Sequence, residues 1–363
     1  MSDQKKLVLY VDPKWRIAGP HIPLLYPFWG NILDPKSTPF QWQLFETYRF
    51  DTRYYSITDN PQEASVVCMP YSHSVVLRYM PEMLEWCAAA SARFNKPLLI
   101  DGMGDIEYPI TTPNTIVLRY GGYRFEKKDN EIHLPLYADD LLERYRGGVY
   151  TPRVKTALPT VAFVGWAALS PMQQLRAVVK ELPQRLCALF DSRFGAKKKG
   201  VFFRKQAMRV LQRSPLVAAR FLVRTSYSGH ADTASKDPAL LREEFIVAME
   251  QGDYCLDVRG DANGSIRLFE ILSLGMIPVI IDTERNLPFS DQIEYKSFAL
   301  IVDFRDMATL PERIAQFHAG LSQEQFDQMR RSARAAYLTY FRVDAILPHL
   351  LQELEKRGVL CQK

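Results

Sequence analysis

Short apolar runs alternate with amphipathic stretches along the first 150 residues of the chain. The amphipathic stretches include Pro81–Phe94, whose length and spacing of apolar residues are typical of a helix. The apolar runs lie at Leu7–Val11, Ser65–Met69, Pro97–Ile100 and Thr115–Leu118. Strands that alternate with crossover helices are typical of a parallel sheet. The pattern therefore predicts an α/β domain over residues 1–150.

A second alternation follows the Gly/Pro-rich, basic segment Tyr145–Pro159, which we interpret as a linker. Its strand-like runs lie at Val161–Val164, Tyr254–Leu256, Ile277–Ile281 and Ala299–Val302. The second predicted α/β domain spans residues 151–335. The chain from Gln323 to Arg357 is predicted to be mostly helical, with an interruption near Pro348. We expect residues 336–363 to form a helical tail that packs back on the first domain.

The stretch with the most specific chemistry runs from Tyr254 to Phe289. A short apolar segment leads into a Gly/Asn-rich loop, a helix that opens near Ser265, and the buried strand-like run Ile277–Ile281. Ser265 is a good N-cap, and Gly275 is a natural stop for the helix. Such a loop and helix N-terminus offer unpaired N–H groups and the positive end of the helix dipole, which suit a diphosphate.

Charged residues favour the interpretation of this stretch as a nucleotide-sugar site. Arg259 in the loop and Arg267 in the helix add positive charge for the diphosphate. Glu270 is near enough to reach ribose hydroxyls while the phosphates lie at Ser265. An ordinary loop–helix–strand of an α/β protein would look similar without the Arg–Glu pair. The residues predicted to bind the donor are Arg259, Gly264, Ser265, Arg267 and Glu270.

The same residues resemble a known family. Residues Ser265–Ile280 resemble the exostosin-type glycosyltransferases of family 47, with the pattern S-x-R-x-x-E-x-x-x-x-G-x-I-P-V-I. The resemblance continues through Leu287–Phe289 and an aromatic and acidic segment to Asp303. Weaker similarity lies upstream at Pro61–Pro70 and Thr160–Gly165. The loop before the serine departs from the family pattern, because the family usually has Cys-Leu-x-Pro-x-Gly where this chain has CLDVRG.

The resemblance implies both a fold and an activity. The implied fold is the GT-B architecture of two Rossmann-like domains with a C-terminal helix, in which the donor binds the C-terminal half and the acceptor faces it across a cleft. The implied activity is inverting transfer of a sugar from a nucleoside-diphosphate donor, with UDP favoured, to a glycan or lipid-linked glycan. Two alternatives stay open: a fucosyltransferase-like enzyme that uses a GDP-sugar, and a non-catalytic protein that binds a nucleotide or glycan.

Catalysis is predicted to need neither a metal ion nor a cofactor. Metal-dependent transferases usually hold manganese or magnesium with an Asp-x-Asp pair, and this sequence contains none. Positive charge from Arg259, Arg267 and the helix that begins at Ser265 is the alternative means of stabilising the leaving diphosphate. Arg153 and Lys155 are further candidate phosphate ligands, for which ordinary linker charges are the simpler interpretation.

A base that takes the proton of the acceptor hydroxyl is expected from the first domain. The loop after Pro97–Ile100 carries Asp101, Asp105 and Glu107 at the carboxyl end of a predicted parallel strand, where α/β proteins place their sites. Asp101 is equally suited to cap the next turn. His21, in an aromatic loop, is a further candidate base, with packing in that loop as its alternative role.

Three other histidines carry weaker signals. His73 and His133 are the remaining histidines of the first domain, and such residues are more often packed or exposed loop residues than bases. His230, in the second domain, is a candidate for contact with the donor from the far side of the cleft.

Composition favours a cytoplasmic protein. The 363 residues are 47% hydrophobic, enough for two domain cores, and no run approaches the roughly 18–20 apolar residues that span a bilayer. The N-terminus MSDQKK, followed by LVLYV, lacks the apolar core of a signal peptide. The five cysteines are scattered and free of C-x-x-C spacing, which favours reduced thiols and argues against zinc.

Positive charge is concentrated in residues 192–231, which hold ten Lys/Arg and no Asp or Glu. Because the formal net charge is +5, the rest of the chain sums to 5 − 10 = −5. Lys205, Arg209 and Arg213 would form a cationic stripe on a helix beside Phe202–Phe203. Three interpretations stay open: a solvated helix face, peripheral contact with the anionic inner surface of a membrane that presents a lipid-linked acceptor, and a nucleic-acid site, for which one basic segment is weak evidence.

Overall fold

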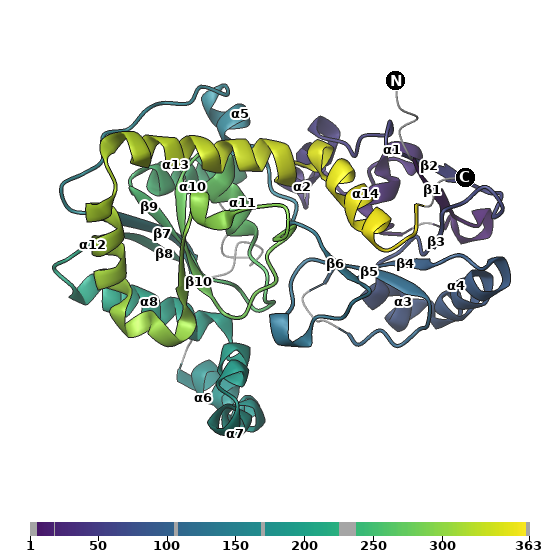
Figure 1. The fold of residues 1–363 in the computed structure, drawn as a ribbon, viewed down its shortest axis with the longest axis horizontal. Coiled ribbons are helices and arrows are strands. Elements are labelled where there is room, and N and C mark those ends of the chain that lie inside the picture. Colours follow the sequence, from purple (N-terminus) through teal and green to yellow (C-terminus); the bar gives the residue numbers. More distant parts are fainter. Residues whose placement is uncertain (1–5, 18, 105–107, 168–170, 225–236, 361–363) are drawn as a thin grey trace.

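The computed structural model describes residues 6–17, 19–104, 108–167, 171–224 and 237–360. The chain forms two sheets that lie side by side, each with helices on its faces (Figure 1). All pairings between the described strands are parallel. The prediction of two α/β units is therefore confirmed: the chain consists of two Rossmann-like units with a C-terminal helix.

The first sheet has the strand order β2-β1-β3-β4-β5-β6. Its strands are β1 Leu7–Tyr10, β2 Tyr55–Thr58, β3 Val66–Cys68, β4 Leu98–Asp101, β5 Thr115–Arg119 and β6 Glu131–His133. Strands β1, β3, β4 and β5 confirm the four predicted runs. The sequence pattern does not predict β2 or β6, because both are edge strands with polar residues and neither forms a continuous apolar run.

The second sheet has the strand order β11-β10-β9-β7-β8. Its strands are β7 Thr160–Trp166, β8 Ala218–Arg224, β9 Tyr254–Asp257, β10 Ile277–Asp282 and β11 Leu300–Asp303. Four of them confirm the predicted runs. The unpredicted strand, β8, lies at the sheet edge inside the basic segment, where arginines interrupt its apolar residues.

Helices connect the strands of each sheet. The first unit contains α1 Tyr26–Trp29, α2 Pro39–Thr47, α3 His73–Tyr79 and α4 Pro81–Phe94. The rest of the chain contains α5 Leu141–Arg146, α6 Pro171–Lys180, α7 Leu182–Phe190, α8 Gly200–Arg213, α10 Pro238–Glu250, α11 Ile266–Ser273, α12 Leu310–Gly320, α13 Gln323–Ala336 and α14 Ile346–Lys356. Helix α4 spans the predicted residues because Pro81 is tolerated in its first turn and Asn95, in the left-handed conformation, ends it.

The C-terminal tail crosses from the second sheet to the first (Figure 1). Helix α13 ends in a π-helical turn at Tyr337–Phe341, and Arg342 is extended. The predicted interruption near Pro348 is thus misplaced, because Pro348 lies in the first turn of α14, where its missing N–H is tolerated. Helix α14 buries Leu347, Leu350 and Leu354 in the same apolar cluster as Leu7 and Leu9 of β1.

A buried ion pair fastens this tail to the connection between the two sheets. Asp140 is fully buried and accepts two hydrogen bonds from Arg334 of α13, at 2.6 Å from Nη1 and 3.0 Å from Nη2. Asp140 also caps α5 by accepting from the backbone N–H of Glu143 at 3.1 Å. The bidentate geometry and the cap offset part of the cost of burying the carboxylate.

The basic segment is part of the second unit and forms α8 and β8. Phe203 and Leu211 of α8 are buried in the apolar cluster on that sheet. Lys205, Arg209 and Arg213 do share the outer side of the helix, where they line a groove. The predicted apolar partner of the stripe is corrected in part, because Phe203 is buried, whereas Phe202 is half-buried and its ring lies 5.8 Å from the guanidinium of Arg185 in α7.

The described cysteines are free thiols: Cys68, Cys87 and Cys255 are buried and Cys187 is exposed, while Cys361 lies outside the described residues. Burial raises the pKa of Cys255 to about 12, which fits a small core residue. In the part of the chain that the structure describes, no helix has both the length and the apolar character needed to cross a membrane.

The Asp140–Arg334 pair generates the first prediction. Replacement of Arg334 by Gln leaves a buried carboxylate without its main partner, so we expect the free energy of unfolding to fall by about 3–5 kcal/mol. Urea denaturation measures the loss. The control is Arg331→Gln on the same helix, because Arg331 is 60% exposed in its pair with Asp327; it should cost less than about 1 kcal/mol. Equal losses in the two variants would contradict a structural role for the buried pair.

Candidate functional site

The candidate donor site lies where β9 ends and α11 begins. Ser265 occupies the N-cap position with extended backbone, at φ −146° and ψ 111°. Its side chain does not cap the helix as predicted, because Oγ donates instead to Oδ1 of Asp257 at 2.5 Å. Ser265 therefore leaves the N–H groups of the first turn of α11 uncapped, where the positive end of the helix dipole favours an anion.

Asp257, the last residue of β9, organises this loop. Its carboxylate is fully buried and also accepts from Nη2 of Arg285 at 2.6 Å. Arg285 follows β10, and its backbone N–H donates to Asp282 at 3.0 Å. The ends of two neighbouring strands are thereby tied together around Ser265 by a buried ion pair.

Arg267 contributes a cation with free hydrogen-bonding capacity. The residue keeps part of its surface exposed, but Nε and Nη1 are buried and have no hydrogen-bond partner among the described residues. Its guanidinium lies 4.6 Å from the centroid of the Phe163 ring. Gly165, at φ +144°, makes room for it, since a Cβ there would overlap Nη2. Burial lowers the pKa of Arg267, and Asp257 and Glu270 oppose that shift.

Glu270 faces the junction of the two units. Its Oε1 accepts from Nη1 of Arg242 on α10 at 2.7 Å, and both side chains are mostly buried. The guanidinium of Arg242 lies 5.4 Å from the ring of Phe40, which belongs to α2 of the first unit. Glu270 lies on the same helix as Arg267, one turn further from the helix N-terminus. The predicted role of Glu270 as a ligand of sugar hydroxyls requires this position.

Arg259 has a different role from the predicted one. It is 1% exposed, and its guanidinium donates to the backbone carbonyls of its own loop, including Asp261 at 2.9 Å. It also donates to the carbonyls of Ala196, at 2.8 Å, and Lys198. The prediction that this charge faces a diphosphate is therefore corrected: the guanidinium points into the protein and holds the loop in shape.

Gly264 marks a close approach between the two units. A Cβ at this position would overlap the carbonyl oxygen of Tyr120, which follows β5 of the first sheet. The neighbouring Asn263 donates from Nδ2 to the carbonyls of Gly122 at 3.0 Å and Thr283 at 3.1 Å. The donor loop is therefore packed directly against the first unit, and only glycine fits at this contact.

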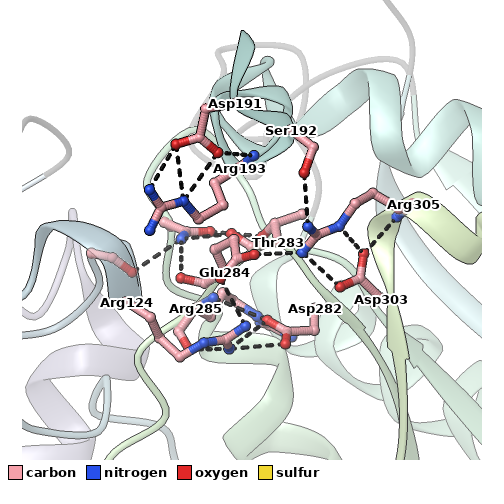
Figure 2. A network of polar contacts seen from close by, with 12 residues as sticks. Arg124, Asp191, Ser192, Arg193, Asp282, Thr283, Glu284, Arg285, Asp303 and Arg305 are labelled. Carbon is pink, nitrogen blue, oxygen red and sulfur yellow. Dashed lines mark hydrogen bonds and ion pairs between the residues drawn. The ribbon is translucent and has the colours of Figure 1, made fainter. Parts of the chain in front are cut away.

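A network of ion pairs continues the contact between the units (Figure 2). Arg124 of the first unit donates to Asp282 and to Glu284, each at 3.0 Å. Glu284 also accepts from Arg305 at 2.5 Å, and Arg305 pairs with Asp303 at 2.7 Å. The carboxyl ends of β10 and β11 are thereby fixed against the segment that follows β5.

Among the candidate bases of the first unit, Asp101 is a buried residue that caps a turn. Asp101 is 1% exposed; its Oδ1 accepts from the backbone N–H of Met103 at 2.7 Å, and its Oδ2 accepts from the Tyr120 hydroxyl at 3.0 Å. Burial raises the pKa of Asp101 to about 6, yet the carboxyl performs the turn-capping role that the sequence also allowed. Asp105 and Glu107 lie outside the described residues.

His21 is a packed residue. Its Nε2 lies 3.0 Å from the carbonyl oxygen of Gly30, and its ring contacts those of Tyr26 and Trp29. The ring is 5% exposed, and burial lowers its pKa. The alternative role of His21, packing within the aromatic loop, is the one that the structure shows.

The remaining sequence candidates lie away from the donor loop. Arg153 donates to backbone carbonyls after α10, including Gln251 at 3.1 Å, and Lys155 donates to the carbonyl of His318 at 2.8 Å. Both lie where the strands of the second sheet begin, whereas the donor loop lies where they end. His73 is buried at the start of α3, and His230 lies outside the described residues.

A buried cluster of charged and histidine side chains in the first unit was not predicted from the sequence. Arg119 ends β5 and pairs with Glu131 of β6 at 3.0 Å, while His133 of the same strand lies beside both. His133 is 7% exposed, and neither ring nitrogen makes a hydrogen bond among the described residues, although backbone at Gly121 is near enough to affect its pKa. The cluster borders Gly102, at the carboxyl edge of the first sheet.

Comparison with known protein families supports the resemblance in the second unit. The profile of the Exostosin GT47 domain matches residues 179–317, which include the whole donor loop and helix α11. This part of the chain is therefore similar to the exostosin-type glycosyltransferases of family 47. The resemblance seen at Ser265–Ile280 is thus confirmed, whereas the weaker similarities at Pro61–Pro70 and Thr160–Gly165 fall outside the match.

Relatives with sequence similarity carry exostosin names. The chain is 34% identical to "Exostosin-1 homolog" of Caenorhabditis elegans over 117 residues, which is 32% of this chain and 30% of that protein. It is 27% identical to "Exostosin-2" of Homo sapiens over 115 residues, 31% of this chain and 16% of that protein. The matched stretch spans less than a third of the length of these relatives.

Comparison with solved structures gives matches of low sequence identity and low TM-score. An α1,3-fucosyltransferase structure is 13% identical with a TM-score of 0.34, covering 99% of this chain and 91% of that one. A structure of HepE from Anabaena in complex with UDP and glucose is 10% identical with a TM-score of 0.39, covering 97% of this chain and 100% of that one. At such values these proteins do not bear on the site of this chain.

The buried side chain of His133 gives a pH prediction. Burial lowers the pKa of His133 from 6.5 to about 4. Between those values the unfolded chain binds a proton that the folded chain does not, so stability is lost as the pH falls from 6.5 toward 4. Relative to His133→Gln, the wild-type protein should lose up to about 1.4 kcal/mol per pH unit in that window.

Urea denaturation of both proteins at pH 7, 6 and 5 measures the difference. His349→Gln is the control, because His349 is more exposed and hydrogen-bonded at both ring nitrogens. Parallel pH profiles for wild type and His133→Gln would show that His133 titrates normally.

Proposed function

We propose that this protein is a glycosyltransferase that moves a sugar from a nucleoside-diphosphate donor to a glycan or lipid-linked glycan acceptor, with inversion and without a metal ion. The observation that carries the proposal is Arg267, whose buried Nε and Nη1 have no hydrogen-bond partner among the described residues. A buried cation with open donor positions, beside an uncapped helix N-terminus, is suited to an anion.

We propose that the donor diphosphate binds at the start of α11. The first turn of α11 has no side-chain cap, and Arg267 belongs to that turn, with its guanidinium in the space that Gly165 leaves. Glu270 lies one turn further along, where its carboxylate would accept from ribose hydroxyls. Its ion pair with Arg242 holds that carboxylate in a fixed orientation.

Stabilisation of the leaving diphosphate follows from the same arrangement. Negative charge develops on the diphosphate as the bond to the sugar breaks, and Arg267 and the helix dipole are already in place to meet it. Such preorganised donors cost no rearrangement at the moment of reaction, and they perform the role that a divalent ion has in enzymes with an Asp-x-Asp pair. We therefore propose metal-independent transfer.

The acceptor and the base are assigned to the first unit. Its carboxyl edge faces the donor loop through the contact between Tyr120 and Gly264. Asp105 and Glu107 remain the candidate bases from the sequence, and the Arg119–Glu131–His133 cluster lies at the same edge. We favour UDP as the nucleotide, following the resemblance to family 47, with GDP as the alternative to be tested.

Arg267 provides the direct test. Arg267→Gln removes a charge-assisted contact that strengthens in the transition state, so transfer should lose about 2–4 kcal/mol of stabilisation, or about 30- to 1,000-fold in kcat/KM. The control is Arg313→Gln on α12, because that arginine is exposed in its pair with Asp306. Kinetics with a panel of UDP- and GDP-sugars measure both variants.

A second variant reaches the same cation indirectly. Gly165→Ala places a methyl group where Nη2 of Arg267 lies, so it should displace the guanidinium and weaken donor use without removing a charge. Wild-type kinetics in both Arg267→Gln and Gly165→Ala would remove the site from α11. Nucleotide binding without transfer or donor hydrolysis, across the whole panel, would identify a non-catalytic binding protein.

Metal independence is tested separately. Transfer should survive excess EDTA and should change little on addition of manganese, because the leaving group is stabilised by Arg267 and the α11 N-terminus. The assay is initial rate of transfer with and without chelator, using the sugar donor identified in the panel. Complete loss with EDTA that a divalent ion restores would contradict the proposed electrostatics.

A further inference from the structure

Helices α6 and α7 expose a continuous row of apolar side chains. Their exposed fractions lie between 48% and 94%, with Phe190 the most exposed. The row, called the apolar stripe from here on, consists of Met172, Leu175, Val179, Leu182, Leu186, Leu189 and Phe190. From Met172 to Leu189 the spacing alternates between three and four residues, which places these side chains on one face of a helix. An exposed apolar face of this length marks an interaction surface.

The two helices form one bent rod. Across the junction, the N–H of Glu181 donates to the carbonyl of Ala177 at 3.0 Å, and the N–H of Arg185 donates to that of Glu181 at 2.9 Å. Pro183, which has no N–H, lies at the bend. In Figure 1 the rod projects from the lower end of the second sheet, away from the rest of the chain.

The rod is firmly anchored at its base. The Glu181 carboxylate accepts from the backbone N–H of Lys199 at 2.6 Å. The turn that follows α7, Ser192–Lys197, buries Gly195 and Ala196. Arg259 binds the carbonyl of Ala196, so the anchor is continuous with the donor loop. The start of α7 and the turn after it are therefore tied to the segment that precedes α8 and to the donor loop.

Strong positive charge surrounds the stripe. Residues 171–224 contain thirteen Lys/Arg and two Asp/Glu, a net of 13 − 2 = +11, and the rest of the chain therefore sums to 5 − 11 = −6. Lys205, Arg209 and Arg213 of α8 line a groove of about 380 Å³ together with Ala167. Since Ala167 lies four residues before α6 begins, this cationic groove lies near the root of the rod.

We propose that α6–α7 lies in the surface of an anionic lipid membrane. The apolar stripe would enter the boundary of the acyl chains, and the cations of α6 and α8 would contact the phosphates of the headgroups. A helix with an apolar face, flanked by Lys and Arg, is the arrangement that binds such interfaces. This inference does not depend on the proposed function.

Charge favours lipid over a second copy of the chain. The stripe has the spacing of a coiled-coil seam, so self-pairing is the main alternative occupant. The rod itself, residues 171–190, holds three Lys/Arg and one Glu, a net of 3 − 1 = +2, so two copies paired through the stripe would bring like charges together. An anionic lipid surface supplies both an apolar interior and negative charge, so it complements both features of the rod.

The residues proposed to enter the membrane differ from those that the sequence indicated. Residues 192–231 supply cations, but Phe203 of that segment is buried in the core. The apolar part comes instead from residues 171–190, which precede the basic segment. Basic residues alone would adsorb to a membrane, whereas the stripe predicts insertion, and the two outcomes can be separated.

Flotation with vesicles tests the binding. The full chain should bind vesicles of phosphatidylcholine and phosphatidylglycerol at 7:3 at least tenfold more than phosphatidylcholine alone, at low salt. The triple variant Leu186→Gln, Leu189→Gln, Phe190→Ser should lose at least tenfold in binding. The matched control is Val149→Gln, Val154→Gln, Leu240→Gln, because these apolar residues are 66%, 80% and 70% exposed but lie outside the rod. The control should bind as wild type does.

Insertion is measured with the native thiol of α7. Cys187 is exposed, whereas Cys68, Cys87 and Cys255 are buried, so an environment-sensitive dye can be attached to Cys187 in a Cys361→Ser background. Its fluorescence should rise on anionic vesicles and should be quenched by lipids with bromine in their acyl chains. Binding without quenching would show adsorption through cations alone and would overturn the role of the stripe.

Sedimentation velocity tests whether a second copy of the chain, and not lipid, covers the apolar stripe. A wild-type dimer that the triple variant converts to monomer, with no vesicle binding, would assign the stripe to a second copy and overturn the proposal. Absence of both vesicle binding and dimers would also overturn it. Donor binding should be the same in all of these variants, since none lies at α11, so failure here leaves the proposed function standing.

Discussion

A buried arginine held by backbone carbonyls is the contact on which the second unit depends. Arg259 is 1% exposed, and it joins its own loop to the carbonyls of Ala196 and Lys198. The rings of Tyr123 and Phe203 lie 5.8 and 5.7 Å from its guanidinium. Removing such a charge from water costs several kcal/mol, which the surrounding carbonyl dipoles offset. The donor loop, α8, the base of α6–α7 and the first unit therefore meet at one cation.

The arginines around this loop divide into two kinds. Arg259 donates to carbonyls and Arg285 donates to Asp257, so both define the shape of the loop, and each leaves a buried Nε without a partner in the described structure. Arg267 is held by packing on Phe163 and keeps hydrogen-bond donors without partners in the described structure. Arg267 is therefore the cation of this loop that we propose meets the developing negative charge of the leaving group.

The anchor also relates the two surfaces of the second unit. The rod of α6–α7 is fixed at Glu181 and at residues 195–198, and Arg259 continues from there into the donor loop. With the rod in a lipid surface, the donor loop is held at a set position relative to that surface. An acceptor carried on a lipid would then reach the site from one direction.

Local pattern by itself determined much of this protein. The apolar runs predicted eight of the eleven named strands, and Pro81–Phe94 was predicted as a helix with the bounds that the structure shows. The spacing of Ser265, Arg267 and Glu270 indicated the candidate site. Each of these features depends on residues that are close in sequence. Only the tertiary structure decided which charges are free. Arg259 and Ala196 are separated by 63 residues, and Asp257 and Arg285 by 28, so no local signal shows that these cations are already paired. Burial of Phe203 and Asp101 was decided in the same way, by contacts distant in sequence.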